Sequence, residues 1–281
     1  MSGRRVEAAL VSALAHFMGI LPWGAGQYRL ADTYIRADRW PEGRTVTRRM
    51  RTGNRMELEV GDRTQALAYM LGNYSPEIIR YVCRALSPGG VFLDVGANVG
   101  LVTFGVAAKR RDVIVHAFEP NPANVDAWRR NRALNPFAHA ELYVAAVSDR
   151  RGVARFAVPT DSGSGMLSED GGFDVQTLTL DDYCAERRIE RIDALKIDVQ
   201  GHEEAVLRGA RRLLSEGRIR AVVLETDEDP TAGRSAAMTG FLSGFGYASS
   251  AIVPYGLRRV RGARAHVPDV AFVRHLTTST S

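Results

Sequence analysis

A short apolar run that ends in a glycine turn, VFLDVGANVG at residues 91–100, constrains the fold of this chain more than any other stretch. Its apolar residues lead into Asp94, and Gly96 and Gly100 then enclose the segment Ala97-Asn98-Val99. A strand that runs through a glycine turn into a helix is how an α/β protein holds a nucleotide-like ligand. By itself the stretch leaves NAD, ATP and S-adenosylmethionine open as that ligand.

The glycine turn departs from the G-x-G-x-x-G pattern of dinucleotide-binding folds. Its pattern is D-x-G-x-N-x-G, in which Asn98 takes the place of the middle glycine. Asn tolerates left-handed backbone geometry better than other residues with a Cβ atom, but the glycine that lets a backbone approach a pyrophosphate is missing. The carboxylate of Asp94 is expected to point toward the ligand. There it would repel a diphosphate and attract a sulfonium ligand that carries a free amino group.

Strands and helices are predicted to alternate from this turn to the end of the chain. The expected strands are 91–95, 113–119, 141–147, 194–198, 221–225, 247–253 and 269–275, and the expected helices are 99–109, 124–133, 181–187, 202–214 and 236–245. A hairpin from 152–158 and 174–180, with a flexible loop at 160–172, interrupts the alternation. Repeated βα units predict an α/β fold, with a mostly parallel sheet and helices on both faces. The last two strands are joined by only a loop and are expected to be antiparallel neighbours.

Two further strand ends supply polar residues near this turn. Glu119 ends the second strand, where a carboxylate can accept hydrogen bonds from both hydroxyls of a ribose. Dehydrogenases and methyltransferases share that arrangement. Asn121 follows it and is counted with it among the cofactor-binding candidates. After the third strand, Val147-Ser148-Asp149 could contact an adenine, although a plain turn explains either polar residue equally well.

The fourth strand ends in LKIDVQGHE, residues 195–203. Asp198 lies at the carboxyl end of a central strand, where an open α/β sheet places its ligand. Gly201 lets the chain turn sharply into the next helix. Glu203 falls in the first turn of that helix, where an acid suits the helix dipole, so capping is the simpler role for it.

Taken in order, these stretches resemble the FkbM family of S-adenosylmethionine-dependent methyltransferases. The matching stretches are VFLDVGANVG (91–100), AFEPNP (117–122), AVSDRRG (146–152), TLDDYC (179–184) and LKIDVQGHEEAVLRGA (195–210), with NYSPEIIRYV before the first. The resemblance implies a Rossmann-like class I methyltransferase domain over residues 56–281, with a mostly parallel seven-stranded sheet and a C-terminal antiparallel hairpin strand. Residues 1–55 are then an N-terminal extension with an amphipathic helix and the start of a hairpin.

The resemblance also implies a role for each matching residue. The methionine part of the cofactor is assigned to Asp94, Gly96, Asn98 and Gly100, the ribose to Glu119, the adenine side to Ser148 and Asp149, and the amino group or reaction centre to Asp198. The family usually reads I-D-V-E-G-A-E where this chain has Gln200 and His202. A carboxylate is therefore lost and an imidazole is gained near the reaction centre.

A methyltransferase that acts on a hydroxyl must align its acceptor and remove the proton. The family is mostly associated with O-methylation of sugars or secondary metabolites, which implies a small-molecule or glycan acceptor. Asp198 and His202 are the candidate catalytic residues, since an imidazole with an ordinary pKa of about 6.5 accepts a proton near neutral pH. A surface position would explain His202 as well. Glu225 and Asp227 could join Asp198 in holding Mg²⁺, or Glu225 could line the acceptor pocket.

Two other functions stay open. A non-catalytic module that binds S-adenosylmethionine would explain the altered Gln200 and His202. A nicotinamide-dependent oxidoreductase would share the acid of the second strand, but it needs a tighter glycine loop and leaves LKIDVQG unexplained. The net charge is +5, and the arginine clusters lack interleaved aromatic residues. A nucleic-acid partner is therefore not expected.

The run AALVSALAHFMGILPW follows Arg4 and Arg5 near the N-terminus. His16 interrupts it, it lacks a good signal cleavage site, and it is short for a membrane span. The expected structure is an amphipathic helix that packs on the domain or touches a membrane surface. Cys83 and Cys184 are expected to be buried free thiols, which suits a cytoplasmic protein. The oligomeric state is left open.

Overall fold

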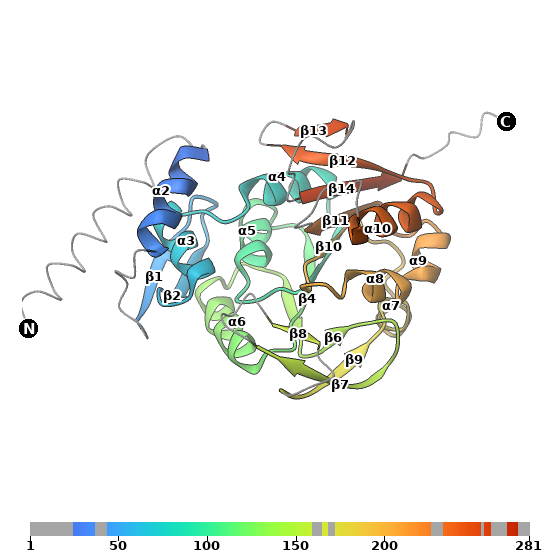
Figure 1. Cartoon of the computed structure of the whole chain (residues 1–281), viewed down its shortest axis with the longest axis horizontal. Helices are drawn as coiled ribbons and strands as arrows, with labels where there is room; N and C mark the ends of the chain where they lie inside the picture. The colour runs from blue at the N-terminus through green and yellow to red at the C-terminus, as the bar shows by residue number, and fades with distance from the viewer. Residues whose placement is uncertain are drawn as a thin grey trace, which may run out of the picture.

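A computed structural model of the chain describes residues 25–36, 44–158, 165–167, 172–225, 233–253, 256–259 and 269–274. These residues form an α/β fold with a large sheet and a smaller one beside it (Figure 1). The amphipathic helix expected near the N-terminus and the loop that contains Asp227 lie outside them. Among the described helices, none has the length and apolarity needed to cross a bilayer. Both cysteines are free, Cys184 buried and Cys83 partly buried.

The large sheet contains the strand that leads into the glycine turn. From one edge to the other, its strands are β13 (Gly256–Arg259), β12 (Tyr247–Val253), β14 (Asp269–Arg274), β11 (Ala221–Glu225), β10 (Ala194–Ile197), β3 (Val91–Val95), β4 (Ile114–Phe118) and β5 (Ala140–Tyr143). The strands from β11 to β5 are parallel, and β14 is antiparallel to both neighbours. The predicted α/β class is confirmed. In the described part the sheet has one strand beyond the expected seven, because β13 folds back along β12.

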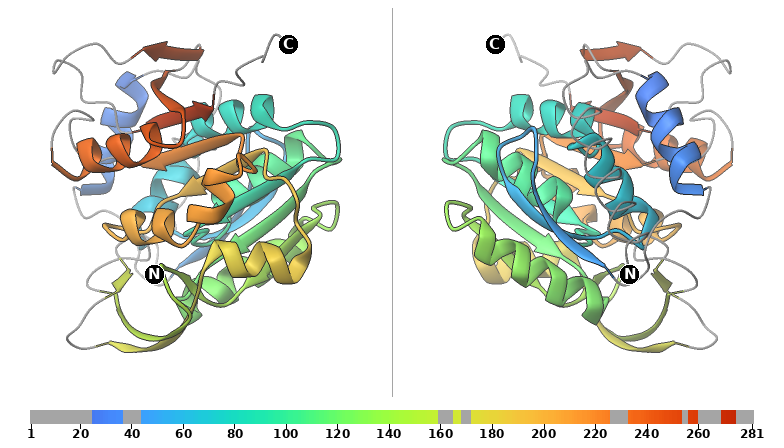
Figure 2. Two further views of the ribbon diagram at one scale, coloured as in Figure 1. Left: turned by 90° about the vertical axis from the view of Figure 1, so that its right-hand side faces the viewer. Right: turned by 90° about the vertical axis from the view of Figure 1, so that its left-hand side faces the viewer.

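Helices cover both faces of the large sheet (Figure 2). One face carries α4 (Pro76–Ala85), α5 (Leu101–Lys109) and α6 (Pro122–Leu134), and the other carries α7 (Leu180–Arg187), α8 (Glu203–Arg208), α9 (Arg211–Ser215) and α10 (Gly233–Ser243). Successive strand residues serve opposite faces, since Phe92 packs with the first group of helices and Leu93 with the second. With both faces covered, the carboxyl ends of the parallel strands are the place where a ligand can enter.

The small sheet lies next to the end of β5. Its strands, in order, are β6 (Ala146–Val147), β9 (Phe173–Leu178), β7 (Gly152–Ala157) and β8 (Met166–Leu167). The hairpin predicted from 152–158 and 174–180 is confirmed as β7 and β9. The single strand predicted over 141–147 is wrong. The N–H of Ala145 donates to the carbonyl of Tyr143 at 3.0 Å, and this tight turn directs β6 into the small sheet.

The single helix predicted over 202–214 is also wrong, because a break near Gly209 separates α8 from α9. The carboxylate of Asp181, on α7, accepts the backbone N–H groups of Arg212 (2.8 Å) and Leu213 (2.9 Å). These donors at the start of a helix have no partner within it, so the carboxylate allows α9 to begin anew. As a result α8 is short, and it begins directly after the loop that follows β10.

The N-terminal part contributes α2 (Ala25–Arg36), α3 (Arg63–Leu71) and a hairpin of β1 (Thr45–Arg49) and β2 (Arg55–Glu59). The domain boundary expected between residues 55 and 56 falls at the start of β2. Met56 and Leu58 of that strand lie in the same apolar core as α4 and α5. The hairpin therefore packs as part of the main core, and the division of the chain at that point stays a prediction.

Two buried asparagines, Asn131 of α6 and Asn135 directly after this helix, fasten the hairpin. The Oδ1 atom of Asn131 accepts the N–H of Glu57 (2.7 Å), and its Nδ2 donates to the carbonyl of Val99 (3.0 Å). The Oδ1 atom of Asn135 accepts the N–H of Arg55 (3.0 Å), and its Nδ2 donates to the carbonyl of the same residue (2.7 Å). The two side-chain amides therefore form the hydrogen bonds with the backbone of β2 that a neighbouring strand would otherwise form.

Replacing Asn131 by alanine is expected to lower the free energy of unfolding by about 2 kcal/mol, because buried backbone groups of β2 and of the glycine turn lose their partners. Denaturant titration measures this change. Arg129→Ala, on the exposed side of the same helix, is the control and should change stability by less than about 0.5 kcal/mol. Equal midpoints for the two variants would mean that the amide does not hold the hairpin.

Candidate functional site

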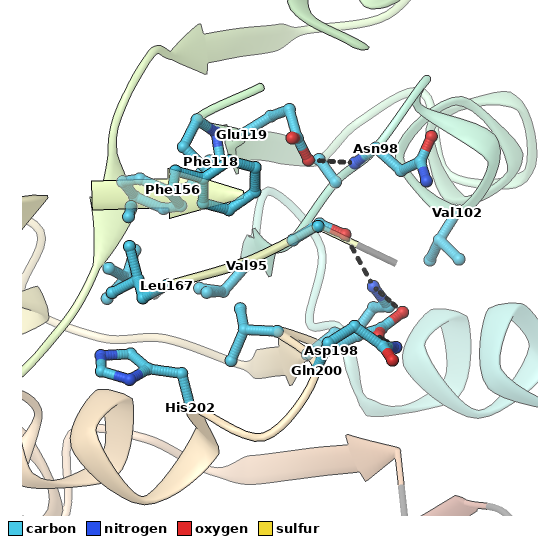
Figure 3. A pocket seen from close by; sticks show the side chains of 18 of the residues that line it. Val95, Asn98, Val102, Phe118, Glu119, Phe156, Leu167, Asp198, Gln200 and His202 are labelled. Carbon is cyan, nitrogen blue, oxygen red and sulfur yellow. Dashed lines mark hydrogen bonds and ion pairs between the residues drawn. The ribbon is translucent and has the colours of Figure 1, made fainter. Parts of the chain in front are cut away.

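A cavity of about 310 Å³ opens at the carboxyl ends of β3, β4 and β10 (Figure 3). Its walls come from residues 95–98, 101–102, 118–120, 145–147, 156, 165, 167 and 196–202 (197 and 201 excepted), with Arg63, Thr64 and Tyr74 from the N-terminal part. Phe156 and Leu167 face Asn98 and Val102 across it. The glycine turn, the acid of the second strand and the end of the fourth strand therefore meet in one cavity.

The turn after β3 brings its backbone to the cavity. Gly96 has φ +77°, and a Cβ atom built on it would lie 1.8 Å from the carbonyl oxygen of Asp198. Asn98 has φ +52°, the left-handed geometry for which Asn is suited. The N–H groups of Gly96 and Ala97 both donate to the carbonyl of Phe118 at 3.0 Å. This turn thus needs a glycine at its first position and is locked to the end of β4.

Glu119 is the buried acid of this cavity, with only 4% of its surface exposed. Its Oε2 accepts the N–H of Asn98 (2.8 Å), and its Oε1 accepts the N–H of Asn121 (3.0 Å) and the Nδ2 of Asn124 (3.3 Å). Burial raises the pKa of this carboxyl to about 7, although these donors act in the opposite direction. The carboxylate is therefore fixed in direction at the cavity wall.

Lys196 is a cavity residue that the sequence argument missed. Its side chain, 5% exposed, projects from β10 between two carboxylates. The Nζ atom lies 3.4 Å from Oδ1 of Asp94 and 3.2 Å from Oδ2 of Asp198, and it donates to the carbonyl of Gly96 at 3.2 Å. The sequence signal for it was a lysine within the apolar strand ALKI, because a buried lysine is seldom found without charged or polar partners.

The loop after β10 holds Asp198 at the cavity edge. The Nε2 of Gln200 donates to Oδ1 of Asp198 at 3.2 Å, and Gln200 itself has φ +51°. Glu203 accepts the backbone N–H groups of Gly201 (2.9 Å) and Val199 (3.4 Å) through Oε1. Both donors precede α8, so the carboxylate fastens the loop rather than the free N–H groups of the helix. Both oxygens of Asp198 are thus engaged by donors from the protein.

His202 and Ser148 are joined directly. The Nε2 of His202 lies 2.9 Å from the Oγ of Ser148, whose hydroxyl also approaches Oδ1 of Asp149 at 3.3 Å. Burial lowers the pKa of His202, while the charges of Asp149 and Glu203 raise it. His202 lines the cavity, and Ser148, which follows β6, contacts its imidazole from outside the lining.

Several residues expected to bind a cofactor lie behind the cavity wall. Asp94 is fully buried and outside the lining, and its Oδ2 accepts the hydroxyl of Thr103 at 2.6 Å. Gly100 packs closely on Phe104. The others set back from the lining are Asn121, Ser148 and Asp149. Their roles in cofactor binding stay predictions.

The Mg²⁺ alternative has no support in the residues that the structure describes, where no three His, Cys, Asp or Glu side chains are grouped to hold a metal ion. Of the three proposed ligands, Asp198 contacts Lys196 and Gln200. Asp227 lies outside the described residues, and so does the side chain of Glu225.

A family model described as the methyltransferase FkbM domain matches residues 94–249, more than half of the chain. The match begins at Asp94 in β3 and ends in β12. It includes the glycine turn, Glu119 and the loop after β10.

Curated relatives carry related names. The chain is 31% identical over 151 residues to the 2-O-methyltransferase NoeI of Sinorhizobium fredii, covering 47% of this chain and 61% of that protein. It is 32% identical over 197 residues to the 31-O-demethyl-FK506 methyltransferase FkbM of Streptomyces tacrolimicus, covering 58% and 74%. It is 26% identical over 155 residues to the hexuronic acid methyltransferase AglP of Haloferax volcanii, covering 55% and 64%. Two of these matches span less than two thirds of the relative's length.

Proposed function

The chain belongs to the FkbM family of methyltransferases, and we propose that it transfers a methyl group from S-adenosylmethionine to a hydroxyl of a sugar or a secondary metabolite. The observation that carries the proposal is the meeting of the left-handed turn at Gly96–Asn98 with the buried carboxylate of Glu119 in one cavity. The names of the relatives support the acceptor class, since they are a 2-O-methyltransferase, a 31-O-demethyl-FK506 methyltransferase and a hexuronic acid methyltransferase.

The cavity fits the proposed cofactor part by part. Glu119 presents a carboxylate that can accept the two ribose hydroxyls, and the small apolar residues 145–147 form a wall for the adenine. The Gly96 backbone lies so close to Asp198 that a Cβ atom would not fit between them, and this turn and the loop after β10 form the end of the cavity proposed for the methionine moiety. Asp94, Lys196 and Asp198 together carry one net negative charge, which suits a ligand with an ammonium and a sulfonium group.

The cofactor supplies an electrophilic methyl group on a positively charged sulfur, and the chain must orient the acceptor and take its proton. Asp198 is suited to holding a cation rather than a proton, because Lys196 and Gln200 already donate to its two oxygens. His202 is the better proton acceptor, because burial lowers its pKa and keeps the imidazole neutral near pH 7. The apolar and aromatic residues Tyr74, Phe156 and Leu167 would cover the acceptor and exclude water.

His202→Gln separates catalysis from cofactor binding. If His202 takes the proton, the variant should lose about 10²–10⁴-fold in kcat and keep its affinity for S-adenosylhomocysteine within threefold. Steady-state kinetics and calorimetry measure the two quantities. A fall in affinity with little change in kcat would instead place His202 and Ser148 on the adenine side.

A direct test of the function is incubation of the purified protein with S-adenosylmethionine and a panel of acceptors. The panel holds uronic acid glycosides, amino-sugar oligosaccharides and a macrolide with free hydroxyls. Formation of S-adenosylhomocysteine together with an O-methylated product supports the proposal. Tight binding of S-adenosylhomocysteine without transfer to any member, in an extended panel, would favour the non-catalytic module. Binding of NADH in its place would favour the oxidoreductase.

The affinity for S-adenosylhomocysteine is expected to fall as the pH is lowered from 8 to 6, because Glu119, with a pKa of about 7, becomes protonated and loses an acceptor. Calorimetry across this range measures the effect, and Glu119→Gln should bind more weakly with a flat profile.

The same raised pKa means that ionised Glu119 destabilises the fold, so stability relative to Glu119→Gln should decrease as pH rises from 4.5 to about 7. A pH profile shared by both proteins would refute the role of Glu119.

A further inference from the structure

Lysine is rare in this chain, and one of its two lysines is buried at the cavity. Of the 37 basic residues only Lys109 and Lys196 are lysines. Lys109 is exposed at the end of α5, whereas the side chain of Lys196 is 5% exposed inside β10. Removing an ammonium group from water is strongly unfavourable unless charged and polar partners surround it. The partners of Lys196 therefore indicate what it is for.

Two carboxylates and one backbone carbonyl, from three segments, surround the ammonium group of Lys196. Asp94 lies beside it on β3, in direct cross-strand register, with Oδ1 3.4 Å from Nζ. The carbonyl of Gly96 is 3.2 Å away and belongs to the glycine turn. Oδ2 of Asp198 is 3.2 Å away and belongs to the loop after β10. A compact ammonium with three donors can serve acceptors in three directions, which the planar fork of an arginine does not match.

The two carboxylates differ in their exposure. Asp94 is fully buried and also accepts a hydrogen bond from Thr103, so it anchors the ammonium from behind. Asp198 has 16% of its side chain exposed and lines the cavity beside Lys196, so it is the carboxylate of the pair that a ligand can reach. The order from the core outward is Asp94, Lys196 and Asp198. A ligand in the cavity can thus contact the Asp198 carboxylate, whereas Asp94 stays behind Lys196.

We infer that Lys196 is a positioning residue of the methyltransferase site: fixed by Asp94 and the Gly96 carbonyl, its ammonium holds the Asp198 carboxylate in the orientation that receives the cofactor. The inference rests on the proposed function, since it assumes that S-adenosylmethionine occupies this cavity. Lys196 does not touch the reacting atoms and acts through Asp198.

A double-mutant cycle tests this dependence by calorimetric titration with S-adenosylhomocysteine. All proteins carry Asp94→Asn, so that removing Lys196 leaves no unpaired charge in the core. In this background, Lys196→Met should weaken binding at least tenfold. When Asp198→Asn is also present, Lys196→Met should change binding less than threefold. Lys109→Met is the matched control and should leave the affinity unchanged. An equal loss in both backgrounds, or no loss in the first, overturns the inference, provided that the variants show cooperative unfolding.

A second readout follows from the scarcity of lysine. Labelling with lysine that carries ¹³C at Cε alone gives two Cε signals, one from each lysine. Saturating S-adenosylhomocysteine should shift the Lys196 signal and leave that of Lys109 in place. An unshifted Lys196 signal at saturation contradicts the inference alone, whereas failure of the unmodified protein to bind S-adenosylhomocysteine contradicts the proposed function itself.

Discussion

Gly96→Ala is expected to abolish binding of S-adenosylhomocysteine and to lower the thermal unfolding midpoint more than any other glycine-to-alanine change in the turns described above. The backbone of Gly96 is left-handed, with φ +77°, which by itself costs a residue with a Cβ atom about 1–2 kcal/mol. The added methyl would also lie 1.8 Å from the carbonyl oxygen of Asp198, a backbone atom that can move only with its loop. The turn and the loop after β10 must therefore separate, and the cavity between them changes shape.

Gly246→Ala is the control for the free-energy cost of placing alanine in a left-handed backbone. Gly246 has φ +82°, nearly the same as Gly96, but no atom lies within 4 Å of a Cβ atom built there. Differential scanning fluorimetry and calorimetric titration are run on both variants. Gly246→Ala should lose stability and keep full affinity for S-adenosylhomocysteine. If Gly96→Ala were no less stable than Gly246→Ala and still bound the ligand, the turn would not be the close-approach element described here.

Lys196→Met is expected to destabilise the protein by about 3–5 kcal/mol, because removing one partner of a buried ion pair leaves an uncompensated charge. Here the orphaned group is Asp94, which is fully buried. Adding Asp94→Asn should recover a large part of this loss, since the amide carries no charge and can still contact Thr103. Denaturant titration of the single and double variants measures both steps.

Lys109→Met, on the exposed end of α5, controls for the loss of a lysine and should stay within about 0.5 kcal/mol of the parent. A Lys196→Met protein as stable as its parent, or a double variant no more stable than the single one, would mean that Asp94 and Lys196 do not form the buried pair described here.

The parts of the site that depend on local backbone chemistry were predictable from the sequence. The glycine pattern fixed the turn, and the left-handed Asn98 follows from the tolerance of Asn for that geometry. The strand-end positions of Glu119 and Asp198 follow from the βα alternation, because parallel strands bring their carboxyl ends to one edge. The family stretches lie in the same region, since they contain these turns.

The parts that depend on tertiary packing were not predictable. Asp94 looks like a ligand residue from its place in the motif, yet Thr103 and Lys196 hold it in the core. Phe156 and Leu167 lie in no motif. They reach the cavity because the turn after Tyr143 directs the chain into the small sheet. No local pattern relates such segments.

The contact of His202 with Ser148 shows the same limit. These residues are 54 positions apart. From the sequence alone, His202 is assigned to proton removal at the reaction centre and Ser148 to the adenine side of the cofactor. Their hydrogen bond depends on how the loop after β10 turns back toward β6. Gly209 contributes, since a Cβ atom there would lie 2.0 Å from the carbonyl oxygen of Ser148.

The central claim is that S-adenosylmethionine binds in this cavity through Glu119. Calorimetric titration of the full chain with S-adenosylhomocysteine, beside Glu119→Ala and with NADH as the competing ligand, tests it most directly. The account predicts micromolar binding of S-adenosylhomocysteine, at least tenfold weaker binding to Glu119→Ala, and no binding of NADH. A folded parent protein that does not bind S-adenosylhomocysteine, or a Glu119→Ala variant that binds it equally well, would contradict the account.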